Sequence, residues 1–170
     1  MVVSNSGLVT IVGGKWTTYR KMAEDALVDA IAVGGLPSRP CVTENLRLHG
    51  SMERDDPLFP ADYARRVYGS DLAVIDKIAK ENPSLALPLH PRLPYTGAQI
   101  VFGARHEMAR SVEDVLARRT RALLLDARAA SEIAPRAASL LAAELGRDAA
   151  WGSAQVGTFR ALARGYLLDG

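Results

Sequence analysis

The residues best suited to chemistry lie near the start of the chain, where two glycines precede a lysine. Residues 8–12 are rich in β-branched side chains and predict a strand. Gly13 and Gly14 allow a tight turn and a close backbone approach, because neither carries a Cβ. From Thr17 or Thr18 onward, apolar residues recur at helical spacing. A helix N-terminus beside Lys15 predicts a place for an anion or a polarised ring carbonyl.

The lysine is not part of a Walker-type phosphate loop. Such a loop has a glycine five residues before the glycine that precedes the lysine, and a serine or threonine directly after the lysine. The sequence has Val9 and Trp16 at these two positions. On these residues alone, a plain glycine turn with a solvent-exposed lysine explains the pattern about as well as a binding site does.

Two separated blocks of sequence resemble FAD-dependent glycerol-3-phosphate dehydrogenases. Residues 7–26, GLVTIVGGKWTTYRKMAEDA, are similar to the last strand and helix of the FAD domain of that family. Residues 113–130, EDVLARRTRALLLDARAA, resemble the signature of its C-terminal helical domain. The similarity runs from about residue 6 to residue 168, and two blocks in the right order are far more specific than one.

The resemblance implies a mainly α fold, in which a multi-helix C-terminal domain follows a strand–turn–helix remnant of an FAD-binding α/β domain. Residues 1–41 are expected to be the last strand and helix of the FAD-binding domain, and residues 42–170 the C-terminal helical domain. The family oxidises glycerol 3-phosphate to dihydroxyacetone phosphate and passes electrons through FAD to a quinone. By resemblance, Lys15 contacts the substrate, and Gly13, Gly14, Trp16 and Thr17 lie against the flavin.

The same resemblance implies that much of the catalytic machinery lies outside this chain. The Gly-x-Gly-x-x-Gly turn that would hold the FAD pyrophosphate is missing from the sequence, and the family's catalytic base belongs to its N-terminal half. No catalytic residue is therefore assigned, and the chain is expected to be inactive without its own N-terminal FAD domain. The parent is expected to be cytoplasmic and peripheral on the inner face of the cytoplasmic membrane.

The predicted strand at residues 8–12 raises a separate question, because no partner strand is predicted before it. An unpaired strand leaves its backbone groups unsatisfied. In this chain we therefore expect the strand to pair with a second copy, giving a homo-oligomer, or to leave its native position.

Composition favours a helical, soluble domain. The chain has 48% hydrophobic and only 6% aromatic residues, and its net charge of +2 is too small to indicate nucleic acid. The single Cys41 excludes an internal disulfide framework and a cysteine-rich zinc site. The three histidines are too widely spaced for a local metal motif, so no metal site is predicted and they are expected to be surface or hydrogen-bonded structural residues.

A run of arginines in the second block has three readings. Arg118, Arg119 and Arg121, with Arg105 and Arg110 upstream, could pair with carboxylates or helix carbonyls inside the domain. They could also line the interface with the FAD domain. A nucleic-acid patch is the weakest reading, because no aromatic residues are interleaved with them. A stand-alone helical protein-interaction module remains the alternative to the enzyme fragment.

The remaining elements follow from local signals. We predict a weak strand or extended segment at 42–49, an irregular surface segment at 82–94, and a helix from Glu132 to Leu145 with Pro135 in its first turn. Helix caps are predicted at Asp71 or Ser70, Thr96, Ser111, Gly146 and Asp148.

Overall fold

The computed structural model describes residues 1–53, 55–57 and 59–167 of the 170-residue chain. Contacts divide the chain into two compact units, Met1–Leu48 (unit 1) and His49–Gly170 (unit 2). Helices dominate both units, and the strands form only two small hairpins, which confirms the mainly α fold. The predicted domain boundary at residues 41 and 42 remains a prediction.

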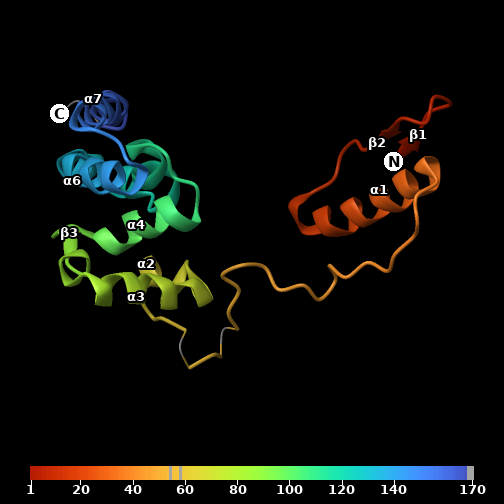
Figure 1. The fold of residues 1–170 in the computed structure, drawn as a ribbon, viewed down its shortest axis with the longest axis horizontal. Helices are drawn as coiled ribbons and strands as arrows, with labels where there is room; N and C mark the ends of the chain where they lie inside the picture. Colours follow the sequence, from red (N-terminus) through yellow and green to blue (C-terminus); the bar gives the residue numbers. More distant parts are fainter. Residues whose placement is uncertain (54, 58, 168–170) are drawn as a thin grey trace. The chain divides into compact units, whose positions relative to one another are not determined.

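Unit 1 is a short hairpin followed by one helix (Figure 1). Strand β1 (Val2–Val3) pairs antiparallel with β2 (Val9–Thr10), a 3-10 turn η1 (Trp16–Thr18) follows, and α1 (Tyr19–Gly34) completes the unit. The expectation that the strand has no partner within this chain is therefore wrong. Gly7 has a φ of +83°, which lets the chain reverse over a few residues and bring Val2 and Val3 beside β2.

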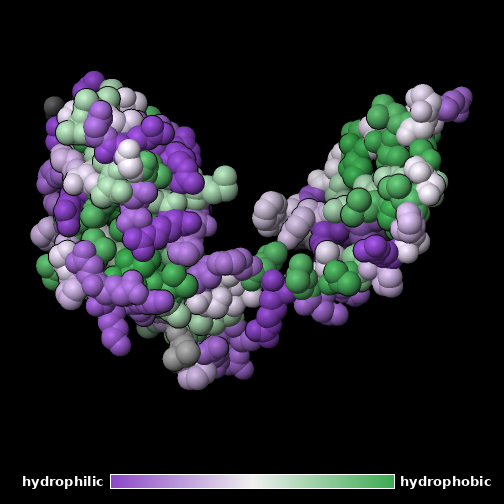
Figure 2. Space-filling model, viewed as in Figure 1, coloured by the Kyte–Doolittle hydropathy of each residue, from purple (hydrophilic) through white to green (hydrophobic). Residues whose placement is uncertain are grey.

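No side chain of residues 1–48 is buried. Figure 2 shows hydrophobic residues gathered on the visible surface of this unit. The segment 42–49, predicted as a weak strand or an extended segment, forms no strand. Its apolar residues, Val42, Leu46 and Leu48, are exposed, and no neighbouring strand offers them a ladder of hydrogen bonds.

Unit 2 consists of helices around a small hairpin. Its elements are α2 (Tyr63–Arg66), η2 (Gly69–Asp71), α3 (Leu72–Glu81), η3 (Pro83–Leu85), β3 (Pro88–His90), β4 (Leu93–Thr96), α4 (Gly97–His106), the π-helical η4 (Asp114–Arg119), α5 (Ala122–Leu125), α6 (Ala127–Leu145) and α7 (Ala149–Arg164). The segment predicted as irregular, residues 82–94, contains β3 and the start of β4, and these two strands pair antiparallel. Prolines fit there because each strand of a two-stranded hairpin has a free edge, where a missing N–H costs nothing.

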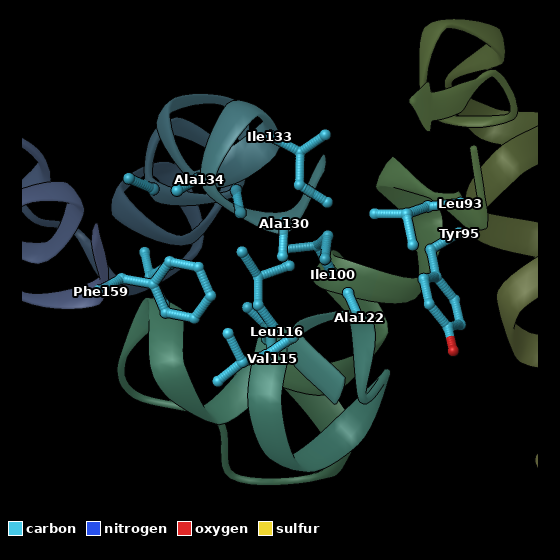
Figure 3. Close-up of a cluster of buried hydrophobic side chains, with 14 of the residues drawn as sticks. Leu93, Tyr95, Ile100, Val115, Leu116, Ala122, Ala130, Ile133, Ala134 and Phe159 are labelled. Atoms are coloured by element: carbon cyan, nitrogen blue, oxygen red, sulfur yellow. The ribbon is translucent and has the colours of Figure 1, made fainter. Parts of the chain in front are cut away.

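The main core of unit 2 lies where α4, η4, α6 and α7 meet. Figure 3 shows Phe159 of α7 reaching toward Val115 and Leu116 of η4 and Ala134 of α6. Phe159 is 1% exposed, and most of the alanines on the inner side of α6 are fully buried. Small residues on α6 allow α7 to approach closely, so the alanine-rich sequence gives dense helix packing.

Helix α6 begins earlier than predicted and contains Pro135 in its interior. Asp126 caps the helix by accepting the N–H of Ala129 at 2.9 Å, so the helix starts five residues before Glu132. Pro135 has no N–H to give to the carbonyl of Ser131. The guanidinium of Arg160, on α7, donates to that carbonyl at 3.4 Å instead. Tertiary packing thus supplies the hydrogen bond that the proline removes.

Most other predicted helix ends are confirmed. Helix α4 starts after Thr96, whose backbone N–H donates to the side chain of Gln99 at 2.8 Å. Asp148 accepts the N–H of Trp151 at 2.8 Å, and Gly146 ends α6 with a φ of +61°. Asp71 does precede α3, but its carboxylate bonds His49 and does not cap the helix. None of the described helices has the length and apolar character needed to cross a bilayer.

Candidate functional site at the glycine turn

The two glycines of the turn adopt backbone conformations that other residues rarely take. Gly13 has a φ of +80° and Gly14 a φ of +115°. A Cβ on Gly14 would collide with the side chain of Met22, whereas a Cβ on Gly13 would meet open space. Gly14 is therefore required by its conformation, because the flexible end of Met22 could move aside, and Gly13 leaves one side of the turn open.

Lys15 lies directly before the first helical turn, in an extended conformation. Its exposed ammonium group makes no hydrogen bond or ion pair with any described residue. A threonine before a helix can cap it, but Thr18 does not do so here. The hydroxyl of Thr18 donates to the carbonyl of Lys15 at 3.1 Å and accepts no first-turn amide. The first amides of η1 and α1 thus remain without a side-chain cap.

The predicted site residues are brought together, apart from Thr17. Gly13, Gly14, Lys15 and Trp16 line one open hollow of about 440 Å³. Its other walls are Ile11, Tyr19, Met22 and Ala23. Trp16 is 83% exposed and its ring stacks on that of Tyr19, with centroids 5.2 Å apart. Thr17 is exposed on the same turn but does not line the hollow.

Charges on the first turns of α1 are paired with one another. Arg20 donates to the carboxylate of Glu24 at 2.8 Å, and Lys21 contacts Asp25 at 2.9 Å. The hydrogen bond from Arg20 lowers the pKa of Glu24. Lys15 is thus the cation near the turn that stays available, since its neighbours on the helix are neutralised.

Most arginines of the run pair with carboxylates or backbone carbonyls inside the domain, which is the first of the three predictions made for them. Arg105 makes a two-pronged contact with Glu144 at 2.6 and 2.8 Å. Arg110 donates to the carbonyls of Ala104 and Ala109, Arg118 bonds Glu113 and Asp114, and Arg119 donates to the carbonyl of Glu107. These guanidinium groups hold α4, η4 and α6 in place. Arg121 makes no such contact among the described residues.

The histidines also have structural partners. His49 bonds Asp71 at 2.7 Å, His90 bonds Glu132 at 2.9 Å, and the ring of His106 stacks on Phe102. Within the described residues, no three His, Cys, Asp or Glu side chains are grouped as a metal site would need.

The residues that the sequence did not single out are Tyr63, Tyr68 and Tyr95, which line a hollow in unit 2 with Arg118, Arg119 and Arg121. The arginines were visible in the sequence, but the tyrosines lie 23 or more residues away from them. Tyr68 comes beside them only through the turn between α2 and η2, and Tyr95 only through β4. The positive φ of Arg121, +59°, has no local sequence signal such as glycine or asparagine.

Known proteins resemble this chain over most of its length. Residues 41–151 match the family described as the C-terminal domain of alpha-glycerophosphate oxidase. The mitochondrial glycerol-3-phosphate dehydrogenase of Mesocricetus auratus is 36% identical over 159 residues, which cover 84% of this chain and 22% of the relative. That of Arabidopsis thaliana is 36% identical over 82% of this chain and 26% of its own length, and a probable one from Caenorhabditis elegans is 35% identical over 90% and 23%.

The chain spans about a quarter of the length of these curated relatives. No solved structure matches it significantly. The family match covers well over half of the 170 residues, including α2 to α6 and the second sequence block. The chain therefore belongs to the family of the C-terminal domain of alpha-glycerophosphate oxidase.

Proposed function

We propose that this chain is the C-terminal part of an FAD-dependent glycerol-3-phosphate dehydrogenase, which oxidises glycerol 3-phosphate to dihydroxyacetone phosphate and passes the electrons to a quinone. The observation that carries the proposal is the extent of the match to glycerol-3-phosphate dehydrogenases. It covers 84% of the chain, which is more than unit 2 alone and so includes part of unit 1. The proposal thus joins the glycine turn of unit 1 to the helical unit 2 in one enzyme.

The glycine turn has the properties that one edge of a flavin requires. The backbone at Gly13 is open, and the uncapped amides after Lys15 point their partial positive charge outward. Gly13, Gly14, Trp16 and Thr17 would hold the flavin edge by backbone contacts. FAD, when bound, supplies the hydride acceptor for the alcohol. The uncapped helix end would stabilise the negative charge that develops beside it.

Lys15 would bind the substrate. Its ammonium group has no partner among the described residues and lies beside the turn, so a phosphate or the hydroxyl side of glycerol 3-phosphate can pair with it. Because the neighbouring Lys21 is paired with Asp25 and Glu24, it is a natural control for the loss of one positive charge.

Unit 1 would be completed by the N-terminal FAD domain of the parent. Its apolar side chains, among them Leu8, Val12 and Leu27, are mostly exposed, and covering them would contribute about 25 cal/mol per Å². We further infer that the chain alone neither holds FAD tightly nor oxidises glycerol 3-phosphate. The parent is proposed to be cytoplasmic and to lie peripherally on the inner face of the cytoplasmic membrane, which fractionation of cells would test.

The test uses the parent enzyme with Lys15→Ala beside Lys21→Ala. Losing a charge-assisted contact to a bound anion costs about 1.5–3 kcal/mol, which corresponds to a loss of roughly 10- to 150-fold in kcat/KM. The flavin absorbance of both variants should equal that of the parent. Lys21→Ala should change kcat/KM less than about twofold.

Equal kinetics for Lys15→Ala and the parent would show that Lys15 is only a turn residue. A second arm assays the 170-residue chain itself with an artificial dye as electron acceptor. Dye reduction above background, or a yellow purified chain, would contradict the assignment of the flavin site mainly to the N-terminal domain.

A further inference from the structure

Besides the hollow at the glycine turn of unit 1, the chain has a hollow of about 450 Å³ in unit 2. The proposed function gives it no role. It is lined by residues of α2, β4, η4 and α5 and of the segments beside them. The lining residues are Tyr63, Ala64, Val67, Tyr68, Tyr95, Glu107, Arg118, Arg119, Thr120, Arg121, Leu124 and Leu125. Aromatic and aliphatic walls with a few polar groups, in a volume of this size, are typical of small-molecule sites.

The arginines of this pocket differ in how far they are neutralised. Arg118 is held by the carboxylates of Glu113 and Asp114. Arg119 donates to the backbone carbonyl of Glu107 at 2.7 and 3.1 Å. The side chain of Arg121 makes no hydrogen bond or ion pair with any described residue. Arg121 also has a φ of +59°, a conformation that few residues other than glycine take.

Tyr68 provides an independent observation. Its side chain is 6% exposed, yet its hydroxyl has no hydrogen-bond partner among the described residues. Gln99 lies near this hydroxyl, but its amide nitrogen donates to the carbonyl of Ala64 at 3.1 Å. A buried hydroxyl without a partner is destabilising. Burial raises the pKa of Tyr68 above its ordinary value, so the hydroxyl keeps its proton and can donate it.

Glu107 and Tyr95 complete the polar lining. One carboxylate oxygen of Glu107 is buried without a hydrogen bond and lies 3.8 Å from Nε of Arg119, and burial raises the pKa of this carboxyl group. Figure 3 shows the hydroxyl of Tyr95 directed away from the labelled core side chains. Tyr95 lies close enough to Arg121 for the guanidinium to act on its pKa, which burial raises overall. The unsatisfied hydroxyl of Tyr68 and the positive charge of Arg121 therefore belong to the same hollow.

We propose that this pocket binds a small organic anion, namely one carboxylate or phosphate group carried on an apolar or flat body. Arg121 supplies the positive charge, and the hydroxyl of Tyr68 donates a hydrogen bond to the ligand. Tyr63, Tyr95 and Leu124 cover the ligand's body. A bound oxygen would satisfy the buried hydroxyl of Tyr68, which nothing in the described chain does.

The same anionic group could come from a free small molecule or from a carboxylate of another protein segment. The apolar walls favour a free molecule, because they would cover a compact body rather than an extended backbone. Binding by this pocket does not depend on FAD or on glycerol 3-phosphate oxidation, so its failure and the failure of the proposed function can be told apart.

The experiment titrates the 170-residue chain with phenyl phosphate, benzoate and inorganic phosphate, followed by NMR and by thermal melting. We expect saturable binding of phenyl phosphate or benzoate at least tenfold tighter than that of inorganic phosphate. The melting temperature should rise with probe concentration, because only the folded chain binds. The probes are titrated to about 10 mM, where even weak specific binding is detected. If no saturable binding is seen in that range, the proposal is overturned.

Three variants test the named residues. Arg121→Gln should weaken phenyl phosphate binding at least tenfold, whereas Arg136→Gln, which removes an exposed arginine of α6 outside the pocket, should leave it unchanged. Tyr68→Phe should weaken binding several-fold while the melting temperature stays equal or rises. A purely structural Tyr68 would give the opposite result, a lower melting temperature with unchanged binding.

A fourth arm separates the two sources of the anion. An acetylated peptide carrying one aspartate between leucines is titrated in the same way. Tighter binding of this peptide than of phenyl phosphate would overturn the small-molecule assignment and make the pocket a protein-docking site. Weaker binding of the peptide supports the proposal.

Discussion

Two helices of the same length behave differently in this protein. Helix α1 of unit 1 and α7 of unit 2 each have 16 residues and carry alanines and larger apolar side chains. Helix α1 buries no residue, whereas α7 buries Phe159 and Ala163 against the core of unit 2. The difference lies in the surface that each helix meets. Helix α7 packs along α6, while α1 has only a two-stranded hairpin in its own unit.

This comparison indicates that the stability of unit 1 depends on a further surface that would cover its helix and hairpin. An isolated helix of about 15 residues is marginal in water, and the pairs Arg20–Glu24 and Lys21–Asp25 add only a few tenths of a kcal/mol each at an exposed surface. Two strands alone are marginal as well. Unit 2 carries a complete core, so its stability should be independent of unit 1.

The largest expected effect sharpens this contrast between the units. Phe159→Ala removes a ring that is 1% exposed, and the cavity should lower the free energy of unfolding by about 3–5 kcal/mol. Trp16→Ala removes a larger ring that is 83% exposed in unit 1, so the same transition should shift by less than about 0.5 kcal/mol. Urea titration followed by circular dichroism measures both values. A loss for Trp16→Ala close to that for Phe159→Ala would end the distinction between the units.

The second prediction compares two glycines with positive φ. Gly69 in unit 2 has a φ of +51°, and a Cβ there would collide with the carbonyl of Gly50. Gly69→Ala should therefore cost about 2–4 kcal/mol from backbone strain and overpacking. Gly13→Ala meets open space in unit 1, so the cooperative transition of unit 2 should not move. Equal shifts of the melting temperature in the two variants would contradict this expectation.

The features that could be predicted from the sequence are those that depend on neighbouring residues. The capping residues Thr96, Asp148 and Gly146 lie within three residues of the groups they bind, or act through their own conformation. Ser111 and Asp114 bond each other's backbone N–H groups, as the spacing indicates. The glycine turn was found for the same reason, because strand, glycines and helix follow one another directly.

The features that were missed depend on residues far apart in sequence. Pro135 is tolerated inside α6 because Arg160, 29 residues away, donates to the carbonyl of Ser131. The pairing of β3 with β4 uses prolines that locally oppose a strand. The second pocket needs Tyr68 beside Arg121, and no local pattern shows that its hydroxyl is left without a partner. Such sites appear only once the helices are packed.

A smaller effect should depend on pH. Burial alone would raise the pKa of Asp114, but the N–H groups of Arg110 and Ser111 and the charge of Arg118 outweigh it and lower that pKa. A lowered folded-state pKa adds stability above the unfolded value of about 3.9, and this stability is lost as the pH falls below it. Asp114→Ala should cost about 1–2 kcal/mol at pH 7, and the difference from the parent should shrink below pH of about 4.

Glu24 is the matched control in unit 1. The hydrogen bond from Arg20 lowers its pKa as well, but the group is only half-buried and lies in unit 1. Glu24→Ala should leave the unfolding transition of unit 2 unchanged at every pH. The measurement is a series of urea titrations between pH 3 and pH 7. A gap between Asp114→Ala and the parent that stays constant down to pH 3 would mean that the carboxylate charge contributes nothing.

The smallest effect expected on stability comes from removing the hairpin and turn. A chain that begins at Lys15 lacks β1 and β2 but keeps α1 and all of unit 2. Because residues 1–14 contribute no buried side chain, the melting temperature of unit 2 should not change.

Association of the chain with itself should change instead. Leu8 and Val12 are exposed, and each strand of the hairpin has one unpaired edge that can bind a second copy. Sedimentation velocity over a range of concentrations should show association of the 170-residue chain and less of it in the shortened one. If both remain monomeric and equally soluble, the hairpin does not drive association, and the exposed apolar surface of unit 1 needs a different explanation.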